Sequence, residues 1–110
     1  MDDYIVLGKW NNGSAIVKIN EKIVKCHPKY CNHGNGFSWG YNGSGPAQLA
    51  FEILFDFFKK HWTMSIDDAA KYAWDYHQDF KNKIIAKYKQ NRDFALDGSE
   101  IAIFLSYAKK

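Results

Sequence analysis

Hydrophobic and polar residues alternate along the first quarter of the chain. Residues 4–10, 14–20 and 22–26 are rich in β-branched and aromatic side chains, and polar turns at 11–13 and 20–21 separate them. Alternation with a period of two, broken by short polar turns, is typical of antiparallel strands joined by hairpins. We therefore predict an N-terminal meander of three strands.

A helical pattern begins near Pro46, which suits the first turn of a helix. Apolar residues cover most of the circumference of residues 46–60 and leave only a narrow polar stripe of Gln48, Glu52, Asp56 and Lys59. A helix this apolar is expected at the centre of the core. Ser44 or Gly45 is the expected cap.

Two further helices are predicted downstream. After a capping box that begins at Ser65, apolar residues recur every three or four positions to about Lys87, and this stripe includes Trp74 and His77. Asp97 begins a second capping box, for a last helix that runs to Ala108. Residues 94–96 form a possible extra strand between these two helices.

This order of elements predicts one α+β domain over residues 1–110, with a small antiparallel sheet packed on two or three helices. With 110 residues, 46% of them hydrophobic and 17% aromatic, the chain can bury a core and is not expected to be disordered. Its longest apolar stretch, residues 49–58, contains two acidic residues and is too short to span a membrane. The acidic opening, Met1-Asp2-Asp3, is unlike a secretory signal. We expect a cytoplasmic protein, in the host cytoplasm if it is encoded by a phage.

The net charge of +3 comes almost entirely from lysine, because Arg92 is the single arginine. The densest basic stretch runs from Lys81 to Arg92. Charge runs of this kind usually form the solvated face of a helix, although lysines can also support weak, non-specific binding to nucleic acid.

Two cysteines and two histidines lie close together in the segment Cys26, His27, Cys31 and His33. Thiolates and imidazoles are the ligands that zinc prefers. A zinc finger would need a second, separated pair of ligands, however, and no further cysteine exists. The sequence therefore favours two reduced cysteines over a metal site or a disulfide, and we predict no metal and no cofactor.

The most specific motif is a glycine-rich loop that leads into the helix at Pro46. Glycines before a helix let an anion approach the free N–H groups of its first turn. A phosphate or carboxylate could bind there, and Trp39 and Tyr41 would offer a stacking surface on one side of the loop. The predicted ligand-binding residues are His33, Trp39, Tyr41, Gly43, Ser44, Gly45, Ala47 and Gln48. The same residues could instead cap the helix and anchor the loop to the core.

The loop is neither a P-loop nor a nucleophile elbow, because neither glycine spacing is present. His77 lies on an apolar stripe and is expected to be buried, and His61 suits a helix C-terminus. A pair formed by Ser44 and His33 would need a third residue to orient the imidazole, and the sequence offers none. We therefore predict no catalytic residues.

The run Gly36-Phe37-x-Trp39-Gly40-Tyr41-x-Gly43-Ser44-Gly45-Pro46-Ala47-x-Leu49-Ala50, preceded by His33, resembles the signature of a family of small prokaryotic and phage proteins. The family is known as domain of unknown function 6166. Similarity continues through Tyr76, Phe80-Lys81 and Ile84-Ile85-Ala86, whereas the Cys26/Cys31 pair departs from the family pattern. The resemblance implies a fold and a mobile-element setting, and it implies no catalytic residues.

These observations lead us to expect a small, non-catalytic binding protein of phage or mobile-element type. Its expected partner is a phosphate-bearing ligand, such as a nucleotide or a nucleotide-derived signal that is sequestered in counter-defence. The alternatives are a protein-interaction module that inhibits a host factor, and a weak nucleic-acid binder. The aromatic content also leaves a homo-oligomer open.

Overall fold

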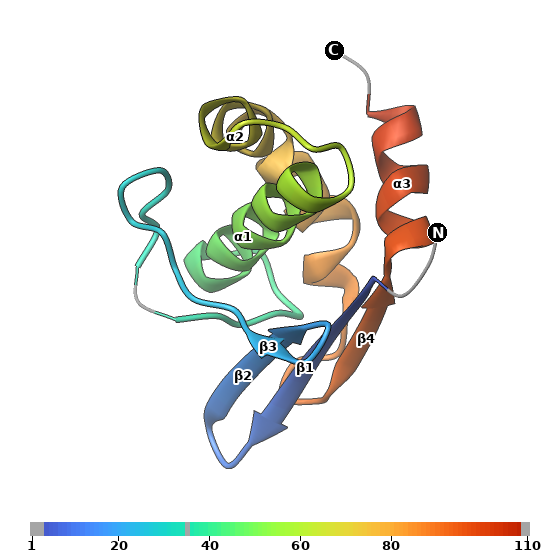
Figure 1. The fold of residues 1–110 in the computed structure, drawn as a ribbon. Helices are drawn as coiled ribbons and strands as arrows, with labels where there is room; N and C mark the ends of the chain where they lie inside the picture. The colour runs from blue at the N-terminus through green and yellow to red at the C-terminus, as the bar shows by residue number, and fades with distance from the viewer. Residues whose placement is uncertain (1–3, 35, 109–110) are drawn as a thin grey trace.

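One antiparallel sheet of four strands lies on one side of the protein, in the order β3-β2-β1-β4 (Figure 1). This arrangement comes from a computed structural model that describes residues 4–34 and 36–108, so the acidic segment Met1–Asp3 lies outside the described residues. The strands are β1 (Ile5–Asn11), β2 (Ser14–Ile19), β3 (Lys22–Ile23) and β4 (Phe94–Asp97). Central β1 pairs with both β2 and β4. The predicted meander and the extra strand are confirmed.

The third strand is shorter than the sequence predicts. Pairing continues only as far as the Val24 N–H, which donates to the Val17 carbonyl at 2.9 Å. Beyond it the chain turns towards the helices, where the N–H of His27 donates to Glu52 Oε2 at 2.7 Å. This hydrogen bond to a helix takes the place of further strand pairing.

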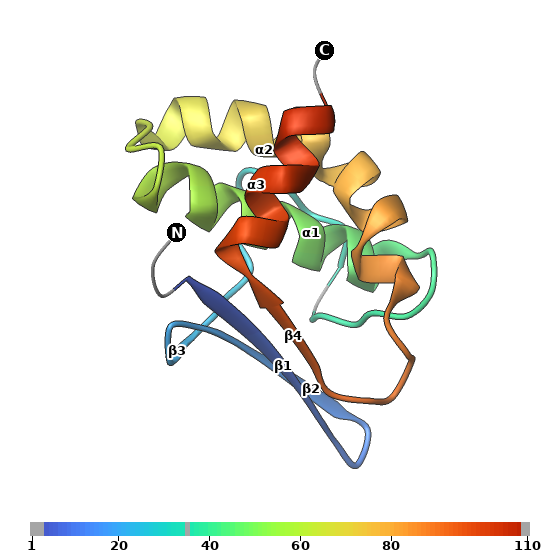
Figure 2. The same ribbon diagram turned by 90° about the vertical axis from the view of Figure 1, so that its right-hand side faces the viewer.

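All three helices lie on the same side of the sheet (Figure 2). They are α1 (Ser44–Lys60), α2 (Ile66–Lys83) and α3 (Gly98–Tyr107), and a short 3₁₀ turn, η1 (Ile85–Lys87), follows α2. Helix α1 lies next to the sheet, and α2 lies beyond α1 (Figure 2). Alternate strand residues such as Val6, Val17 and Leu96 are buried beneath the helices. Ile5, Leu7 and Ile16 face the opposite way and are exposed. The α+β class predicted from the sequence is therefore correct.

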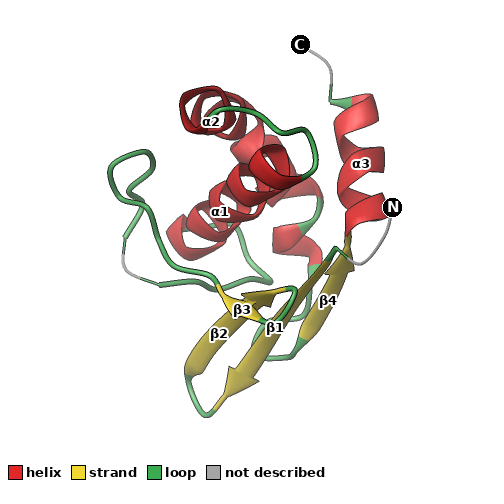
Figure 3. Cartoon of the chain, in the orientation of Figure 1, coloured by secondary structure: helices red, strands yellow, loops and turns green. Residues whose placement is uncertain are grey.

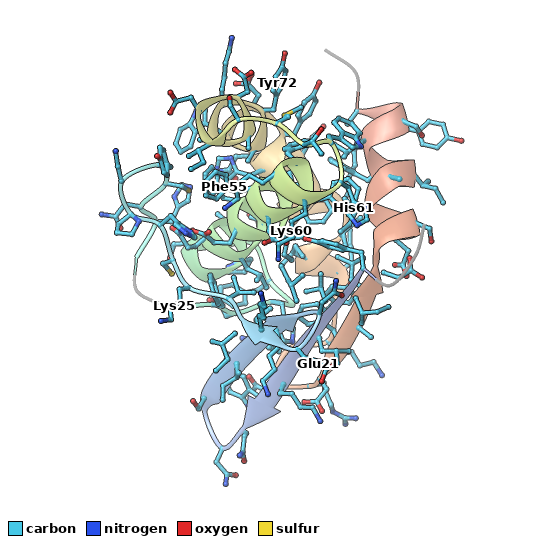
Figure 4. All side chains as sticks on the ribbon, viewed as in Figure 1. Glu21, Lys25, Phe55, Lys60, His61 and Tyr72 are labelled. Carbon is cyan, nitrogen blue, oxygen red and sulfur yellow. The ribbon has the colours of Figure 1, made fainter. Side chains whose placement is uncertain are left out.

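Helix α1 runs through the middle of the core, as its pattern predicts. Every residue from Pro46 to Phe55 is buried, together with Phe57 and Phe58. Figure 4 shows His61 at the end of this helix, where it is the C-cap and contacts the ring of Tyr4 at 5.0 Å between centroids. The predicted cap at Ser44 or Gly45 is wrong, because Gly43 is the N-cap and contributes no side chain.

Helix α2 ends at Lys83, four residues before its predicted end. Ile84 leaves the helical region, with φ −125°, and the chain continues as η1. Ile85 then becomes fully buried, and its carbonyl accepts a hydrogen bond from the N–H of Gly40 at 3.1 Å. Helix α2 therefore ends where the chain meets the distant glycine loop. The helical periodicity of the sequence does not show that contact.

The predicted starts of α2 and α3 are confirmed. Ser65 accepts a hydrogen bond from the N–H of Asp68 at 3.2 Å, and Asp97 accepts one from the N–H of Glu100 at 3.0 Å. The apolar stripe of α2 is less buried than expected, because Ile66 and Trp74 are exposed. Among the described residues, no helix is long and apolar enough to cross a membrane.

Two tyrosine hydroxyls, those of Tyr4 and Tyr88, are buried and differ in their hydrogen bonding. The Tyr4 hydroxyl donates to Asp56 Oδ2 at 2.7 Å. The Tyr88 hydroxyl is buried without a hydrogen-bond partner among the described residues. Burial raises the pKa of both phenols, and the Asp56 charge adds to the effect at Tyr4.

Gly40, in the glycine loop, lies close to the backbone of Tyr88 and Gln90, and a substitution at this glycine tests that contact. Gly40 and Gly13 both have φ +85°, but a Cβ on Gly40 would lie 2.5 Å from the backbone N of Gln90, whereas one on Gly13 would meet nothing within 4 Å. Gly13→Ala should therefore cost only the left-handed backbone strain, about 1–2 kcal/mol. Gly40→Ala should lower the free energy of unfolding by about 1–3 kcal/mol more, because the overlap adds to that strain. Urea unfolding of both variants measures the difference, and equal losses would contradict the close approach.

The different hydrogen bonding of the Tyr4 and Tyr88 hydroxyls gives a second prediction. Tyr4→Phe should destabilise the protein by about 1.5–3 kcal/mol, the usual contribution of a hydrogen bond to a charged group. Tyr88→Phe should be neutral or stabilising, because it removes an unpaired buried hydroxyl. Since the folded protein holds both phenol protons while the unfolded chain releases them near pH 10, the wild type should lose stability as the pH rises above about 10. Each variant should flatten that loss in urea titrations at pH 8 to 11.

Candidate functional site

The glycine loop lies directly on the start of α1. A Cβ on Gly45 would lie 2.0 Å from Ser38 Oγ and 3.2 Å from Ser38 Cβ, so any larger residue would displace the Ser38 side chain. Ser38 Oγ in turn lies 2.8 Å from the Tyr41 hydroxyl, and the two groups share a hydrogen bond. Packing within the protein therefore accounts for part of the glycine pattern, without any ligand.

A small recess remains where the loop meets the helix. It encloses about 200 Å³. It is lined by His33, Gly34, Gly36, Phe37, Ser38, Tyr41, Ser44 and Gly45. The N-terminus of α1 has no side-chain cap and no acidic residue in its first turn. Helices α2 and α3 have both. The recess therefore combines hydroxyl groups with a helix N-terminus that carries no compensating negative charge.

The two aromatic residues of the motif do not form one surface. Trp39 is only 2% exposed, its Nε1 donates to the Arg92 carbonyl at 2.6 Å, and its ring packs against Phe94. Tyr41 is 41% exposed and lies at the recess. The predicted stacking surface of Trp39 and Tyr41 is therefore wrong, since Trp39 is a core residue and Tyr41 alone is accessible to a ligand.

Gln48, which the sequence nominates as a ligand-binding residue, is occupied by internal hydrogen bonds. Its Oε1 accepts from the N–H of His33 at 2.8 Å, and its Nε2 donates both to the Cys31 carbonyl and to Glu52 Oε2, each at 3.0 Å. The side chain is 1% exposed. Ala47 is also buried, and its N–H donates to the Gly43 carbonyl. Gln48 therefore holds the loop backbone in place and does not face the recess.

Glu52, one turn further along α1, is the second buried polar group of this helix. Its Oε2 accepts from the N–H of His27, and its Oε1 lies 2.6 Å from the Nδ1 of the same residue. Together Gln48 and Glu52 attach the loop between β3 and α1 to the side of α1 (Figure 3). His27 is thus a structural partner of Glu52.

A cluster of one cysteine and two histidines lies beside the recess. Cys31 and His33 come from the loop and His77 comes from α2, and their ligand atoms all lie within 4.8 Å of one another. The Nε2 atoms of the two histidines are 2.9 Å apart. We call these three residues the Cys31/His33/His77 cluster. The cluster brings two loop residues together with one helix residue that is far from them in the sequence.

Hydrogen bonding fixes the protonation of His77. Its Nδ1 lies 2.7 Å from the Trp74 carbonyl, which can only accept, so Nδ1 carries the proton and Nε2 is left with a lone pair. Burial lowers the pKa of His77, and burial raises the pKa of the Cys31 thiol to about 12. The His77 ring is therefore neutral at pH 7, and its unprotonated nitrogen faces His33.

The ring of Trp74 covers this cluster from outside. It lies parallel to the His33 ring, with 6.0 Å between centroids and 3° between planes, and contacts His77 at 4.8 Å. Trp74 is 50% exposed. The predicted burial of His77 is confirmed, whereas the predicted core position of Trp74 is wrong, because this side chain shields the histidines from solvent.

The other candidate groups lie apart from this cluster. Cys26 and Cys31 are both free thiols in the structure. The His33 ring is directed at His77, and the described residues show no hydrogen bond between His33 and Ser44. The basic stretch is divided, because Lys81 is buried, Lys83 pairs with Asp79 at 3.7 Å, and the remaining cations follow the end of α2. The structure does not form one continuous basic helix face.

Residues 7–107 match the family of unknown function DUF6166. The chain belongs to this family. Neither the curated proteins nor the solved structures provide a match. The DUF6166 match extends well beyond the glycine loop and includes Cys31, His33, α1 and His77.

Sequence reasoning did not connect His77 with Cys31 and His33 in this DUF6166 protein. His77 is 44 residues from His33 in the chain, and it sits on a helix whose pattern accounts for a buried histidine without any ligand. The sequence feature that could have indicated their proximity is the polar stripe of α1, which is buried in the structure. Because Gln48 and Glu52 must find partners, they draw residues 27–33 against α1, next to α2.

The attachment of the loop to Glu52 can be tested directly. Glu52→Ala should lower the free energy of unfolding by about 3 kcal/mol or more, because it leaves a cavity and unpaired donors on His27 and Gln48. Glu52→Gln should cost less, because the amide can donate to His27 Nδ1 after a change of tautomer and still accept from the backbone N–H. Urea unfolding with tryptophan fluorescence measures both values. Equal losses would contradict the hydrogen-bonded role of Glu52.

Proposed function

We propose that this DUF6166 protein is a non-catalytic binding protein that captures a small phosphate-bearing ligand at the recess on the N-terminus of α1. The observation that carries the proposal is the uncapped start of α1 within this recess, which is lined by Ser38, Tyr41 and Ser44. Helix N-termini attract anions through free N–H groups and the helix dipole. Hydroxyl groups add further donors to phosphate oxygens.

The size of the recess limits what can be buried in it. Sites that enclose a whole drug-sized ligand have volumes of about 300–1,000 Å³. The recess, at about 200 Å³, suits a phosphate group while the rest of the ligand remains outside. Tyr41, exposed at the rim, is positioned to stack with a base or another ring. A nucleotide or a nucleotide-derived signal fits this description, and sequestration of a host signal would make the protein a counter-defence factor of a phage or other mobile element.

A second candidate is a protein-interaction module that inhibits a host factor. The outer face of the sheet favours it, because Ile5, Leu7 and Ile16 are exposed and the helices of the described residues all lie on the opposite side of the sheet (Figure 2). A shallow hollow of about 550 Å³ on this face includes Leu7, Trp10 and Ile16. Exposed apolar patches of this kind often mark contact surfaces.

Thermal unfolding separates the two candidates. In a buffer with chelator, a phosphate-bearing ligand at 100 times its Kd should stabilise the folded protein by about 2.7 kcal/mol and raise the Tm by several degrees. The panel should contain inorganic phosphate, nucleoside mono-, di- and triphosphates and cyclic dinucleotides. Ser44→Asp should abolish the shift, because it adds a negative charge to the recess.

The matched control is Ser14→Asp, which adds the same charge at an exposed position on β2, outside the recess. It should leave the ligand-induced shift unchanged. If no compound in the panel moves the Tm of the wild type, or if Ser44→Asp keeps the full shift, phosphate capture at the recess is wrong. An absent shift would favour the interaction module.

A further inference from the structure

We propose that Cys31, His33 and His77 form a binding site for one divalent transition-metal ion, with zinc as the preferred metal. Their three ligand atoms converge within 4.8 Å, although they come from a loop and from a helix that are distant in the chain. This site is separate from phosphate capture in its chemistry, and only His33 belongs to both the cluster and the lining of the recess.

The chemistry of the three donors favours zinc or a similar ion. Thiolate and imidazole are the ligands of Zn²⁺ and related transition metals, whereas Mg²⁺ and Ca²⁺ take oxygen ligands. One cysteine and two histidines leave one position of a tetrahedral site for water or another ligand. His33 also lines the recess, so one of the three ligands lies next to space that solvent can enter. On binding, the Cys31 thiol releases its proton to solvent.

The distances are close to those that a tetrahedral ion requires. Bond lengths of about 2.0–2.1 Å to nitrogen and 2.3 Å to sulfur place two nitrogens about 3.3 Å apart and a nitrogen and a sulfur about 3.6 Å apart. The Nε2 atoms of His33 and His77 are 2.9 Å apart, and no pair of ligand atoms is separated by more than 4.8 Å. The ligand atoms therefore need to move by only about 1 Å to reach the spacing of a tetrahedral site.

The groups around the cluster hold its ligands in place. His77 donates its Nδ1 proton to the Trp74 carbonyl, which is the usual outer-shell partner of a metal-binding histidine, and its Nε2 lone pair is free. Gln48 accepts from the N–H of His33 and donates to the carbonyl of Cys31, so a single buried side chain fixes both loop ligands. The Trp74 ring then limits the access of water to both histidines.

A simple hydrogen bond between two histidines accounts for less of this arrangement. It explains the 2.9 Å contact, since His33 can donate from Nε2 to the lone pair of His77. It does not explain why the Cys31 thiol lies at the same point. A metal site accounts for the convergence of all three residues.

Cobalt titration of the reduced full-length protein, stripped with chelator and free of phosphate and nucleotides, tests the site. Co²⁺ should bind one ion per chain and give a thiolate-to-cobalt charge-transfer band with the visible absorption of a tetrahedral site, and Zn²⁺ should displace it. Cys31→Ser should remove the charge-transfer band. His77→Gln should weaken Co²⁺ binding by at least about a hundredfold, the upper end of the loss seen when only an outer-shell partner is removed.

The chain provides a matched control, because Cys26 lies near Cys31 in the sequence but outside the cluster. Cys26→Ser should keep the wild-type spectrum and affinity. His33→Gln changes a half-buried ring and gives a ligand variant even if substitution at the buried Cys31 or His77 unfolds the protein. The proposal is overturned if the wild type shows no charge-transfer band, if Cys31→Ser or His33→Gln binds Co²⁺ as the wild type does, or if Cys26→Ser removes the band. Because this assay contains no phosphate compound and the thermal assay contains chelator, either proposal can fail without the other.

Discussion

Gln48 and Glu52 lie on a helix that is buried along most of its length, so their polar atoms need partners inside the protein. Each is only 1% exposed, and leaving such groups unpaired would cost more than their hydrogen bonds contribute. Backbone groups of the loop between β3 and α1 supply those partners at His27, Cys31 and His33. The satisfaction of this polar stripe therefore decides the course of the loop.

The position of the candidate sites follows from this arrangement. Once Gln48 holds the backbone of Cys31 and His33, both side chains lie next to α2, where His77 is directed at them by its hydrogen bond to Trp74. The same loop then continues over the start of α1, where Ser38 and Tyr41 border the recess. Two adjacent features, the recess and the Cys31/His33/His77 cluster, thus depend on one set of buried hydrogen bonds.

The glycine-rich motif has two explanations that apply to different residues. Gly40 is needed because a Cβ there would overlap with the backbone of Gln90, a Cβ on Gly45 would displace the Ser38 side chain, and Trp39 belongs to the core. Ser44 and Tyr41 have no such packing requirement and remain exposed at the recess. Membership in DUF6166 is consistent with either explanation, since the matched region includes both groups of residues.

The sequence by itself determined the class of the fold. Period-two alternation, an almost wholly apolar helix and two capping boxes identify the strands and helices, because these patterns depend on local geometry and on burial of one face. Even the extra strand at β4 was visible as a short segment between predicted helices. The predicted helix ends were less accurate where a tertiary contact changes the path of the chain, as at Ile84, where η1 turns towards Gly40.

Only the tertiary structure decided which polar residues meet. Gln48 and Glu52 could be recognised as a polar stripe, but a solvent-exposed stripe and one covered by a loop have the same sequence pattern. Likewise, the sequence predicts a buried His77 whether or not other polar side chains lie beside it. Its proximity to Cys31 and His33 depends on the path of a loop whose sequence has no periodicity. Local sequence specifies which faces must be buried, whereas the partners of buried polar groups come from distant parts of the chain and are fixed only when the whole core is assembled.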